Sequence, residues 1–364
     1  MRFLTQFFRV VVGIVFIISG FAKTIDPIGF SYKLEEYFGE SVFNISFLHN
    51  LALPLSIFFV ILEVMLGIFL LLGVWRKFIL TSLLLLIIFF SFLTFYSAYF
   101  HKVTDCGCFG DAIKLSPWTS FWKDIVLLFM ILFLVYGFKY IHTLFTLKVN
   151  WIIISIGLVL CLWTVYQGIA HLPIIDFRPY AVGKNLKEGM NDGEPEQNII
   201  IYKLKNLSTN EIKKMNSDEY IGSGIWKDTL TWKIVYTSTK IIKKAKLPSV
   251  HDFSIECLGN DITQEILDQD KIVIITVPFS KKLSIIERAK LRKITFLLKE
   301  KKLKFAILTN DPVFLNPISS CITDQTTLKT INRSNPGLMV LKRGVVVAKY
   351  NGNDFPTANE IEKL

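Results

Sequence analysis

The sequence predicts two structural classes in one chain: an all-α membrane helical bundle followed by a water-soluble α/β domain. Hydrophobic residues make up 52% of the 364 residues, charged residues make up 20%, and the mean hydropathy is +0.45. This composition is too apolar for one soluble globule, and 31 Phe and 7 Trp exclude a disordered chain. Residues 1–172 hold only 11 of the 41 Lys and Arg and 8 of the 30 Asp and Glu. The other charges lie in residues 173–364, at a density that is ordinary for a soluble domain.

Five apolar segments in the first half are long enough to cross a bilayer. A hydrocarbon core of about 30 Å requires roughly 20 apolar residues per helix. The segment 78–100 contains no charged residue, which is typical of a spanning helix and rare in a soluble core. The five segments are residues 3–22, 51–74, 78–99, 121–138 and 151–170.

The short loops predict the orientation of the bundle. One side carries six basic residues and no acid: Arg2, Arg9, Arg76, Lys77, Lys139 and Lys148. The positive-inside rule therefore places the N-terminus in the cytoplasm and the C-terminal half in the periplasm, with the bundle in the inner membrane. A cleaved signal peptide ending near Ala22 is the alternative, but Arg9 interrupts its apolar run and further spans follow. We expect the lipid bilayer as a partner and, for a domain outside the membrane, no nucleic acid.

Two cysteines lie between the third and fourth segments, on the predicted outer side. Cys106 and Cys108 are separated by one glycine, so a disulfide between them would close a small, strained and easily reduced ring. This spacing favours thiol–disulfide exchange by a redox pair. Structural cysteines that tighten the loop are the alternative. A metal site would find only His101 nearby as a further ligand, so we expect none.

Charged residues also occur within or beside the spans. Glu63 lies in the middle of the second segment, Lys123 and Asp124 begin the fourth, and Lys23 ends the first. Because a lone charge is costly in a bilayer, these groups are expected to face the bundle and to have partners. Glu63, Lys123 and Asp124 would form an intramembrane polar cluster that transfers protons to a thiol or binds a quinone headgroup. The alternative is a packing ion pair that fixes the helix register.

Several motifs of the first half carry a family resemblance. They are Ser19-Gly20-Phe21-Ala22-Lys23, Asp26-Pro27-Ile28-Gly29-Phe30, Glu35-Glu36-Tyr37, the loop Asp105-Cys106-Gly107-Cys108-Phe109-Gly110, Trp118 and Phe121-Trp122-Lys123-Asp124. The first three resemble DoxX-like membrane proteins, and the others resemble the MauE branch of that group. MauE proteins belong to methylamine-utilisation clusters, where they are thought to help mature a disulfide-rich periplasmic dehydrogenase subunit. The resemblance covers residues 1–142 and implies a four-helix core with a thiol or assembly role. The fifth helix at 143–172 and the long extension depart from the family pattern.

The second half is expected to contain two parts. Residues 173–245 predict a small β-rich segment, with strands at 198–203 and 229–236 and turns at 191–193 and 222–224. Residues 246–364 alternate between strand and helix patterns, as in an α/β domain. The expected elements are strands at 271–277 and 304–309, a helix at 284–301, a hairpin of 338–341 with 345–349, and a terminal helix at 358–364.

A second resemblance concerns the segment Ser334-Asn335-Pro336-Gly337-Leu338, which is similar to the cis-proline strand of thioredoxin-like domains. It implies that Pro336 is the cis-proline of a client-docking strand. The loop 278–283 lacks the Cys-x-x-Cys of redox-active members, so the domain would be redox-silent. Cys257 and Cys321 either pair with each other or remain free and buried. The fusion of such a domain to a DoxX-like part resembles envelope proteins of the Bacteroidota type.

The sequence leaves three functions open. The first is a thiol–disulfide oxidoreductase or protein-maturation factor that acts on a periplasmic or envelope client, with quinone as a candidate electron acceptor and no other cofactor indicated. The second is a non-enzymatic scaffold or assembly subunit of an envelope complex. A transporter has less support, because only Glu63 lies deep in a span and no inverted repeat is evident.

Overall fold

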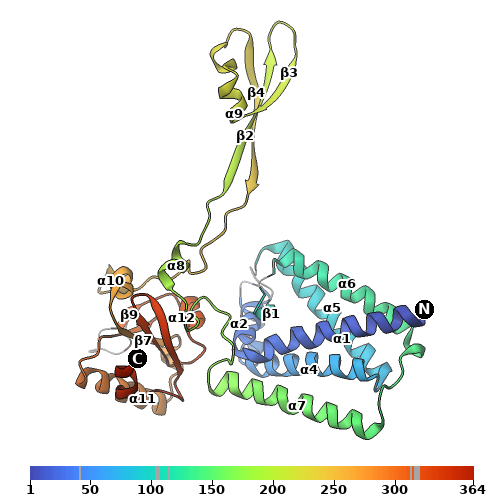
Figure 1. Cartoon of the computed structure of the whole chain (residues 1–364), viewed down its shortest axis with the longest axis vertical. Coiled ribbons are helices and arrows are strands. Elements are labelled where there is room, and N and C mark those ends of the chain that lie inside the picture. The colour runs from blue at the N-terminus through green and yellow to red at the C-terminus, as the bar shows by residue number, and fades with distance from the viewer. Residues whose placement is uncertain (41, 103–106, 114, 312–313, 315–319) are drawn as a thin grey trace. The chain divides into compact units, whose positions relative to one another are not determined.

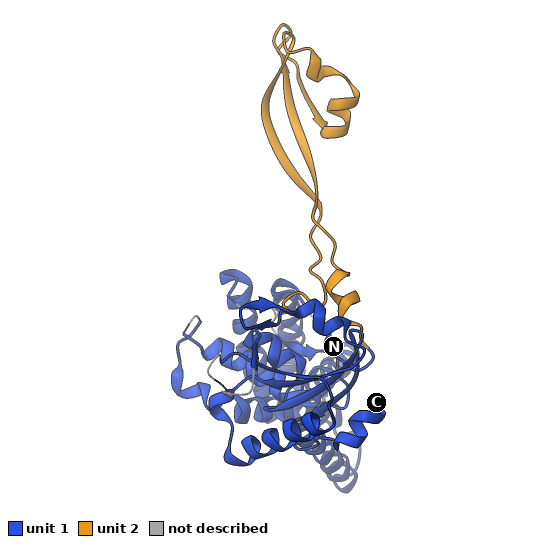
Figure 2. Ribbon diagram, turned by 90° about the vertical axis from the view of Figure 1, so that its left-hand side faces the viewer, with its two compact units in different colours: residues 1–183, 254–364 blue, residues 184–253 orange. Residues whose placement is uncertain are grey.

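The computed structural model describes residues 1–40, 42–102, 107–113, 115–311, 314 and 320–364. Cys106 therefore lies outside the described residues. The chain forms two compact units, which Figure 2 shows in different colours. Unit 1 contains residues 1–183 and 254–364, and unit 2 contains residues 184–253.

Among the described residues of unit 1, five helices are long and apolar enough to cross a membrane, which confirms the five predicted segments. The first, α1, contacts α4, α6 and α7, and α5 packs along α6 (Figure 1). Bulky residues fill the interior of the bundle, with Leu83, Ile131 and Leu134 fully buried among them. The five helices are α1 (Arg2–Ile25), α4 (Ala52–Leu72), α5 (Arg76–Phe100), α6 (Pro117–Tyr136) and α7 (Leu147–Ala170).

Glycines allow α1 and α4 to approach closely. A Cβ atom added to Gly67 would lie 2.8 Å from the carbonyl oxygen of Gly13, and one added to Gly20 would lie 2.7 Å from Val64 Cγ2. Small residues at such crossings let helix backbones touch in a membrane, where packing replaces the hydrophobic driving force. These contacts hold the middle and the C-terminal half of α1 against α4.

The segment between the first two spans contains a helix that the sequence analysis did not predict, α2 (Pro27–Phe38), followed by the short α3 (Ser46–His49). Asp26 is the N-cap of α2, since its carboxylate accepts a hydrogen bond of 2.9 Å from the Gly29 backbone N–H. A proline at the first helical position completes the start signal. The helix buries Phe30 and Leu34 against the bundle.

The C-terminal part of unit 1 is built on a seven-stranded sheet in the order β11-β10-β7-β8-β9-β5-β6. Strands β7, β8 and β9 are parallel, and β10 pairs antiparallel with both β7 and β11. The strands are β5 (Glu256–Cys257), β6 (Asn260–Asp261), β7 (Ile272–Val277), β8 (Phe305–Thr309), β9 (Ser320–Ile322), β10 (Gly337–Lys342) and β11 (Val345–Asn351). The helices are α10 (Thr263–Asp268), α11 (Ile285–Glu300), α12 (Gln325–Ile331) and α13 (Ala358–Lys363). The predicted strands at 271–277 and 304–309, the hairpin and both helices are confirmed within about two residues.

Sequence patterning explains this core. Every residue of β7 is buried, as expected for a central parallel strand covered on both faces. The helix α11 starts at a capping box of Ser284 and Glu287 and contributes Leu291, Ile294 and Leu298 to the core with β7. The Asn335–Pro336 peptide bond that precedes β10 is cis, as the resemblance implied.

Cys257 and Cys321 form a disulfide. The sequence left open whether the two cysteines pair or remain free, and the structure decides for the pair. Cys321 lies in strand β9, which joins β8 and β5 in one sheet, and Cys257 lies in β5.

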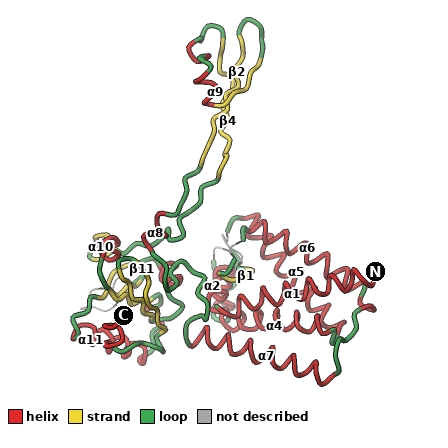
Figure 3. The backbone as a smooth tube through the Cα atoms, in the orientation of Figure 1, coloured by secondary structure: helices red, strands yellow, loops and turns green. Residues whose placement is uncertain are grey.

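Unit 2 contains a three-stranded antiparallel sheet in the order β3-β2-β4. Its strands are yellow in Figure 3, where β2 and β4 are labelled. The predicted strands at 198–203 and 229–236 are parts of the longer β2 (Gln197–Asn206) and β4 (Trp232–Lys243). The strand β3 (Ile212–Asn216) was not predicted. The segments 191–193 and 222–224, predicted as turns, begin with the last residues of α8 (Leu186–Asn191) and α9 (Ser217–Gly222). A capping box of Asn216 and Glu219 starts α9 directly after β3.

Candidate functional site: a polar cavity beside Cys108

A narrow cavity lies inside the membrane bundle, between α1, α2, α4, α5, α6 and strand β1 (Cys108–Asp111). Its volume is about 30 Å³, which is room for about two water molecules. Apolar side chains form most of its wall. Its polar lining residues are Ser19, Lys23, Tyr37, Glu63, Thr94, Cys108, Lys123 and Asp124.

One polar contact in this cavity is an ion pair between Lys23 and Glu63. Their side chains are only 3% and 6% exposed. The Lys23 Nζ atom also lies 5.4 Å from the ring centre of Phe30 and 5.0 Å from that of Phe90. The close packing of Gly20 on α4 brings the end of α1 to this depth, and neither charge would be tolerated there alone. The two ring faces add cation–π attraction to the pair.

A second ion pair lies on α6 at the same cavity. Lys123 Nζ is 2.8 Å from Asp124 Oδ1, and Thr94 Oγ1 donates a hydrogen bond of 3.1 Å to Asp124 Oδ2. Lys123 Nζ also lies 5.3 Å from the ring centre of Phe109, the residue that follows Cys108. The α6 ion pair therefore connects the Cys108 strand with α5.

The structure brings the predicted cluster of Glu63, Lys123 and Asp124 to one cavity, but in two separate pairs. Glu63 pairs with Lys23 of α1, whereas Lys123 pairs with its sequence neighbour Asp124. Both pairs contribute to helix packing and both also line open space. The arrangement therefore fits the packing interpretation and leaves the proton-transfer interpretation as a prediction.

Cys108 forms one edge of the cavity. Its backbone carbonyl accepts a hydrogen bond of 2.7 Å from Ser19 Oγ of α1. Burial raises the pKa of the Cys108 thiol, the positive charge of Lys123 acts in the opposite direction, and the Asp124 carboxylate adds to the increase. The thiol is therefore mostly protonated at neutral pH, and Lys123 is the group that would stabilise its thiolate. The geometry of the predicted pair with Cys106 lies outside the described residues.

Sequence reasoning missed Ser19, Tyr37 and Thr94 as polar residues of this cavity. The Tyr37 hydroxyl lies 2.7 Å from Ser97 Oγ of α5. Tyr37 lines the cavity because it lies on α2. The only local sequence signal for that helix is its start at Asp26-Pro27. Single hydroxyls in apolar helices give no pattern that distinguishes them from neutral packing residues.

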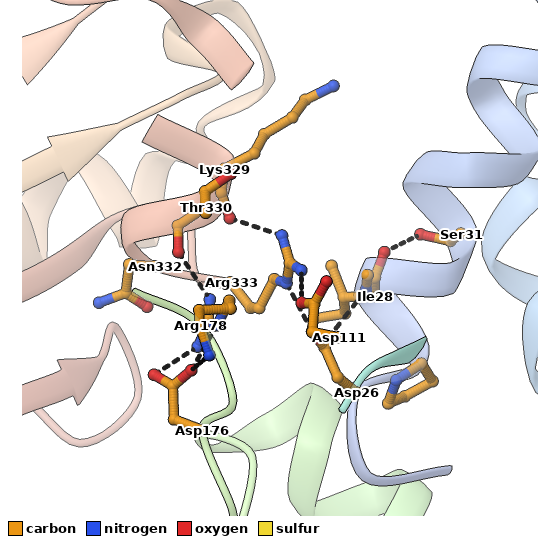
Figure 4. Close-up of polar contacts among 12 residues, drawn as sticks. Asp26, Ile28, Ser31, Asp111, Asp176, Arg178, Lys329, Thr330, Asn332 and Arg333 are labelled. Carbon is orange, nitrogen blue, oxygen red and sulfur yellow. Dashed lines mark hydrogen bonds and ion pairs between the residues drawn. The ribbon is translucent and has the colours of Figure 1, made fainter. Parts of the chain in front are cut away.

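A second polar cluster lies outside the spans, around Arg333 (Figure 4). Arg333 Nε is 2.7 Å from Asp26 Oδ2, and Arg333 Nη2 is 2.6 Å from Asp111 Oδ2. Arg333 Nη1 donates to the Lys329 carbonyl at 2.8 Å. Burial raises the pKa of Asp26, but the Arg333 guanidinium outweighs it and holds that pKa below its usual value. Nothing in the sequence pattern pointed to this cluster.

The predicted docking residue Pro336 lies three residues beyond Arg333. The Asn335 side chain accepts a hydrogen bond of 3.2 Å from the Phe279 backbone N–H and donates one of 3.0 Å to the Phe279 carbonyl. The segment before β10 is therefore joined to the loop 278–283, which holds no cysteine. Docking of a client at Pro336 stays a prediction.

One comparison with known proteins finds a similarity, and it lies in the membrane half. Residues 1–137 match the model of a family described as methylamine utilisation protein MauE. This match confirms the MauE resemblance for the part of the chain that holds the first four spans, the cavity and Cys108. Searches of curated proteins and of solved structures give no significant match. The DoxX and thioredoxin resemblances stay predictions.

Proposed function

We propose that this protein is a multi-pass inner-membrane factor that matures an envelope protein by thiol–disulfide exchange through Cys106 and Cys108. One observation carries the proposal: Cys108 lines the same buried cavity as the Lys23–Glu63 and Lys123–Asp124 ion pairs. The family match to MauE, whose description names methylamine utilisation, supports a maturation role. The basic loops described above support a cytoplasmic N-terminus. The Cys257–Cys321 disulfide supports a periplasmic C-terminal domain, since such bonds persist in oxidising compartments.

The exchange needs two cysteine pairs and no further reagent. A client thiolate attacks the Cys106–Cys108 disulfide, which breaks and leaves a mixed disulfide and one free thiolate. The second client thiolate then breaks the mixed disulfide, so that the client gains a disulfide and the membrane pair becomes a dithiol. Two electrons pass from client to pair, and two protons follow them. When Cys108 is the leaving sulfur, Lys123 stabilises its thiolate.

A quinone does not fit the cavity as it stands. A volume of about 30 Å³ admits about two waters and no aromatic ring. We therefore derive no step through a quinone. The membrane pair returns to the disulfide state by the reverse exchange with another oxidised protein.

The C-terminal domain is proposed as a redox-silent, thioredoxin-like docking domain. The order β7-α11-β8 followed by α12-β10-β11-α13, with a cis-proline before β10, supports this assignment. The organisation proposed for the chain is a bundle at 1–142, a fifth helix at 143–172, a β-rich segment at 173–245 and this domain at 246–364. The strand that begins after Pro336 is the proposed client-docking strand.

Thiol trapping of the full chain in cells tests the proposal. Neither Cys106→Ser nor Cys108→Ser can form the loop disulfide that accepts the client's electrons, so each should lose client oxidation and leave the client as a dithiol. The matched control is Cys161→Ser, a buried cysteine of α7 outside the cavity lining. Unchanged client oxidation in both loop mutants would overturn the exchange function.

The alternative is a scaffold, and one observation favours it: the loop 278–283 carries no cysteine, so the outer domain has binding surfaces without chemistry. Capture with the full chain distinguishes the two functions. A scaffold retains its partner after Cys106→Ser and Cys108→Ser are combined, whereas an exchanger loses the covalent complex.

A further inference from the structure

The strand β1 is anchored at both ends by different parts of the chain. At its start, the Cys108 carbonyl accepts the Ser19 hydroxyl hydrogen bond of 2.7 Å. At its end, the Asp111 carboxylate contacts Arg333 Nη2 at 2.6 Å. Asp111 and Arg333 are 222 residues apart in sequence. A residue of the C-terminal domain therefore holds the strand that carries Cys108.

Arg333 is buried and its donors are distributed over several acceptors. Its side chain is 7% exposed. Two different N–H groups reach the Asp26 and Asp111 carboxylates, and a third reaches the Lys329 carbonyl. A planar guanidinium with five donors suits this task, whereas a lysine ammonium cannot match the same geometry. Charge-assisted bonds of this kind are stronger than neutral ones.

The neighbours of Arg333 continue the same contact. Tyr32 of α2 lies beneath both cations, with its ring centre 5.5 Å from Arg333 Cζ and 4.6 Å from Lys329 Nζ. Lys329 Nζ is also 3.7 Å from Glu35 Oε2. The Tyr32 ring packs against Phe279, with 6.2 Å between the ring centres. The loop 278–283 and the segment before Pro336 thus contact α2 of the same chain.

Asp26 links this contact to the bundle. One of its carboxylate oxygens caps α2 through Gly29, and the other contacts Arg333. Asp26 follows Ile25, the last residue of α1, so the same turn lies close to Lys23 in the cavity wall. Arg333 is therefore bound to both protein segments that flank the outer end of the cavity.

We propose that Arg333 is a positioning residue, which fixes the Cys108 strand through Asp111 and so sets the exposure of the Cys108 thiol. Its functional meaning rests on the exchange function proposed above. Release of Arg333 frees one end of β1, while Ser19 still holds the other. The C-terminal domain would then control the reactive loop of its own membrane part, in addition to any docking of clients.

The alkylation rate of Cys108 in the full chain, with no client present, tests this proposal. A Cys106→Ser, Cys161→Ala background leaves Cys108 as the only free thiol, because Cys257 and Cys321 are bonded. We expect Arg333→Gln and Asp111→Asn each to accelerate alkylation by a maleimide about tenfold. The double mutant should be no faster than Arg333→Gln alone, because that change already removes the Asp111 contact that Asp111→Asn breaks. Arg333→Lys should be intermediate, since a lysine keeps the charge but not the fork.

The matched control is the exposed pair of Arg343 and Asp270, whose side chains are 78% and 85% exposed. Arg343→Gln and Asp270→Asn should leave the alkylation rate unchanged. Arg333→Gln could disrupt the outer domain, and loss of the Cys257–Cys321 disulfide would reveal this. Asp111→Asn then serves as the test variant, because it leaves the Arg333–Asp26 contact in place. An unchanged rate in Asp111→Asn, or additive effects in the double mutant, overturns the positioning role. Because the measurement needs no client, it fails or succeeds separately from the exchange function.

Discussion

The Lys23–Glu63 pair inside the bundle and the Arg333 cluster outside it are both buried ion pairs, but they are surrounded differently. Arg333 contacts two carboxylates, a carbonyl and the face of Tyr32. Lys23 contacts one carboxylate and two phenylalanine rings, and a small cavity adjoins it. A cation with several fixed acceptors has one stable arrangement. A pair beside open space keeps the freedom to change a partner or a proton. The difference favours the positioning role proposed for Arg333, and proton transfer at the Lys23–Glu63 pair stays a prediction.

The largest expected effect tests the inner pair. Glu63→Ala leaves the Lys23 ammonium without its carboxylate in the bundle, and breaking a buried pair in this way costs about 3–5 kcal/mol. The apparent thermal stability of the full chain in detergent should fall strongly. The double change Lys23→Met with Glu63→Leu should recover most of the loss, because matched apolar residues replace buried pairs at little cost. A stable Glu63→Ala protein would show that the pair does not hold the helices together.

A third buried cluster, around Lys349, predicts the next largest effect, which is a dependence of folding stability on pH. Lys349 Nζ lies 2.6 Å from Asp176 Oδ2, and Arg178 contacts the same carboxylate at 2.7 and 2.9 Å. Burial, assisted by the nearby Arg178 charge, lowers the pKa of Lys349 to about 7 despite Asp176. Because the unfolded chain keeps this lysine protonated up to about pH 10.5, the unfolded state binds more protons between pH 7 and that limit.

Stability should therefore rise with pH from about 7 upward, by at most about 1.4 kcal/mol per pH unit from this group. Asp176 acts at the acid end, since Arg178 and Lys349 overcome burial and hold its pKa at about 2. Its contribution is present above the ordinary pKa of 3.8 and is lost as the pH falls toward 2. Thermal unfolding of the wild type and of Lys349→Met, measured at intervals of roughly one pH unit between pH 6 and 9, tests the rise in stability attributed to Lys349. Equal slopes for both proteins would contradict it.

Replacement of Lys123 tests whether the cavity residues set the pKa of the Cys108 thiol. Lys123→Gln removes the positive charge beside Cys108 and should raise the pKa of that thiol further. Alkylation near neutral pH should slow by about tenfold, the effect of roughly one pKa unit. Lys139→Gln is the control: Lys139 lies in the short 3-10 turn that follows the far end of α6, and its replacement should not change the rate. A pH profile of alkylation that is the same in all three proteins would separate Lys123 from the thiol.

The smallest expected effect comes from the exposed pair of Arg343 and Asp270. Its distance of 2.8 Å resembles those of the Arg333 cluster, but water surrounds both side chains. Exposed pairs contribute little, so Arg343→Gln should change stability by no more than about 0.5 kcal/mol. Differential scanning calorimetry of the wild type and Arg343→Gln in the same detergent measures this change. A larger loss would mean that distance alone, and not burial, determines the strength of these pairs.

The sequence predicted the features that depend on local pattern. Apolar length alone located the five spans, and a buried strand such as β7 or an amphipathic helix such as α11 follows from short-range periodicity. The short helix α2 was missed because its cap at Asp26 lies in a segment that otherwise looks like a loop between spans. The strand β9 was missed because it contains only three residues.

The candidate site was predictable only in part. Costly charges in spans identified Glu63, Lys123 and Asp124, and the spacing of Cys106 and Cys108 identified the thiols. The ion-pair partner of Glu63 could not be predicted from the sequence, because Lys23 reaches Glu63 only through the helix packing at Gly20. Arg333 meets Asp26 across 307 residues of sequence. Contacts of that separation leave no periodic signal in a single chain.

The Cys257–Cys321 disulfide makes the stability of the C-terminal domain depend on the redox conditions around it. The bond spans 64 residues, which include β7, α11 and β8, so it encloses the centre of the sheet in a covalent loop. In the chain-entropy model, closing a loop of this length contributes about 4 kcal/mol. Arg333 follows the second cysteine, so the segment that holds the Cys108 strand is made only after both cysteines of this bond. Oxidation of the chain therefore stabilises the domain whose Arg333 contacts the Cys108 strand.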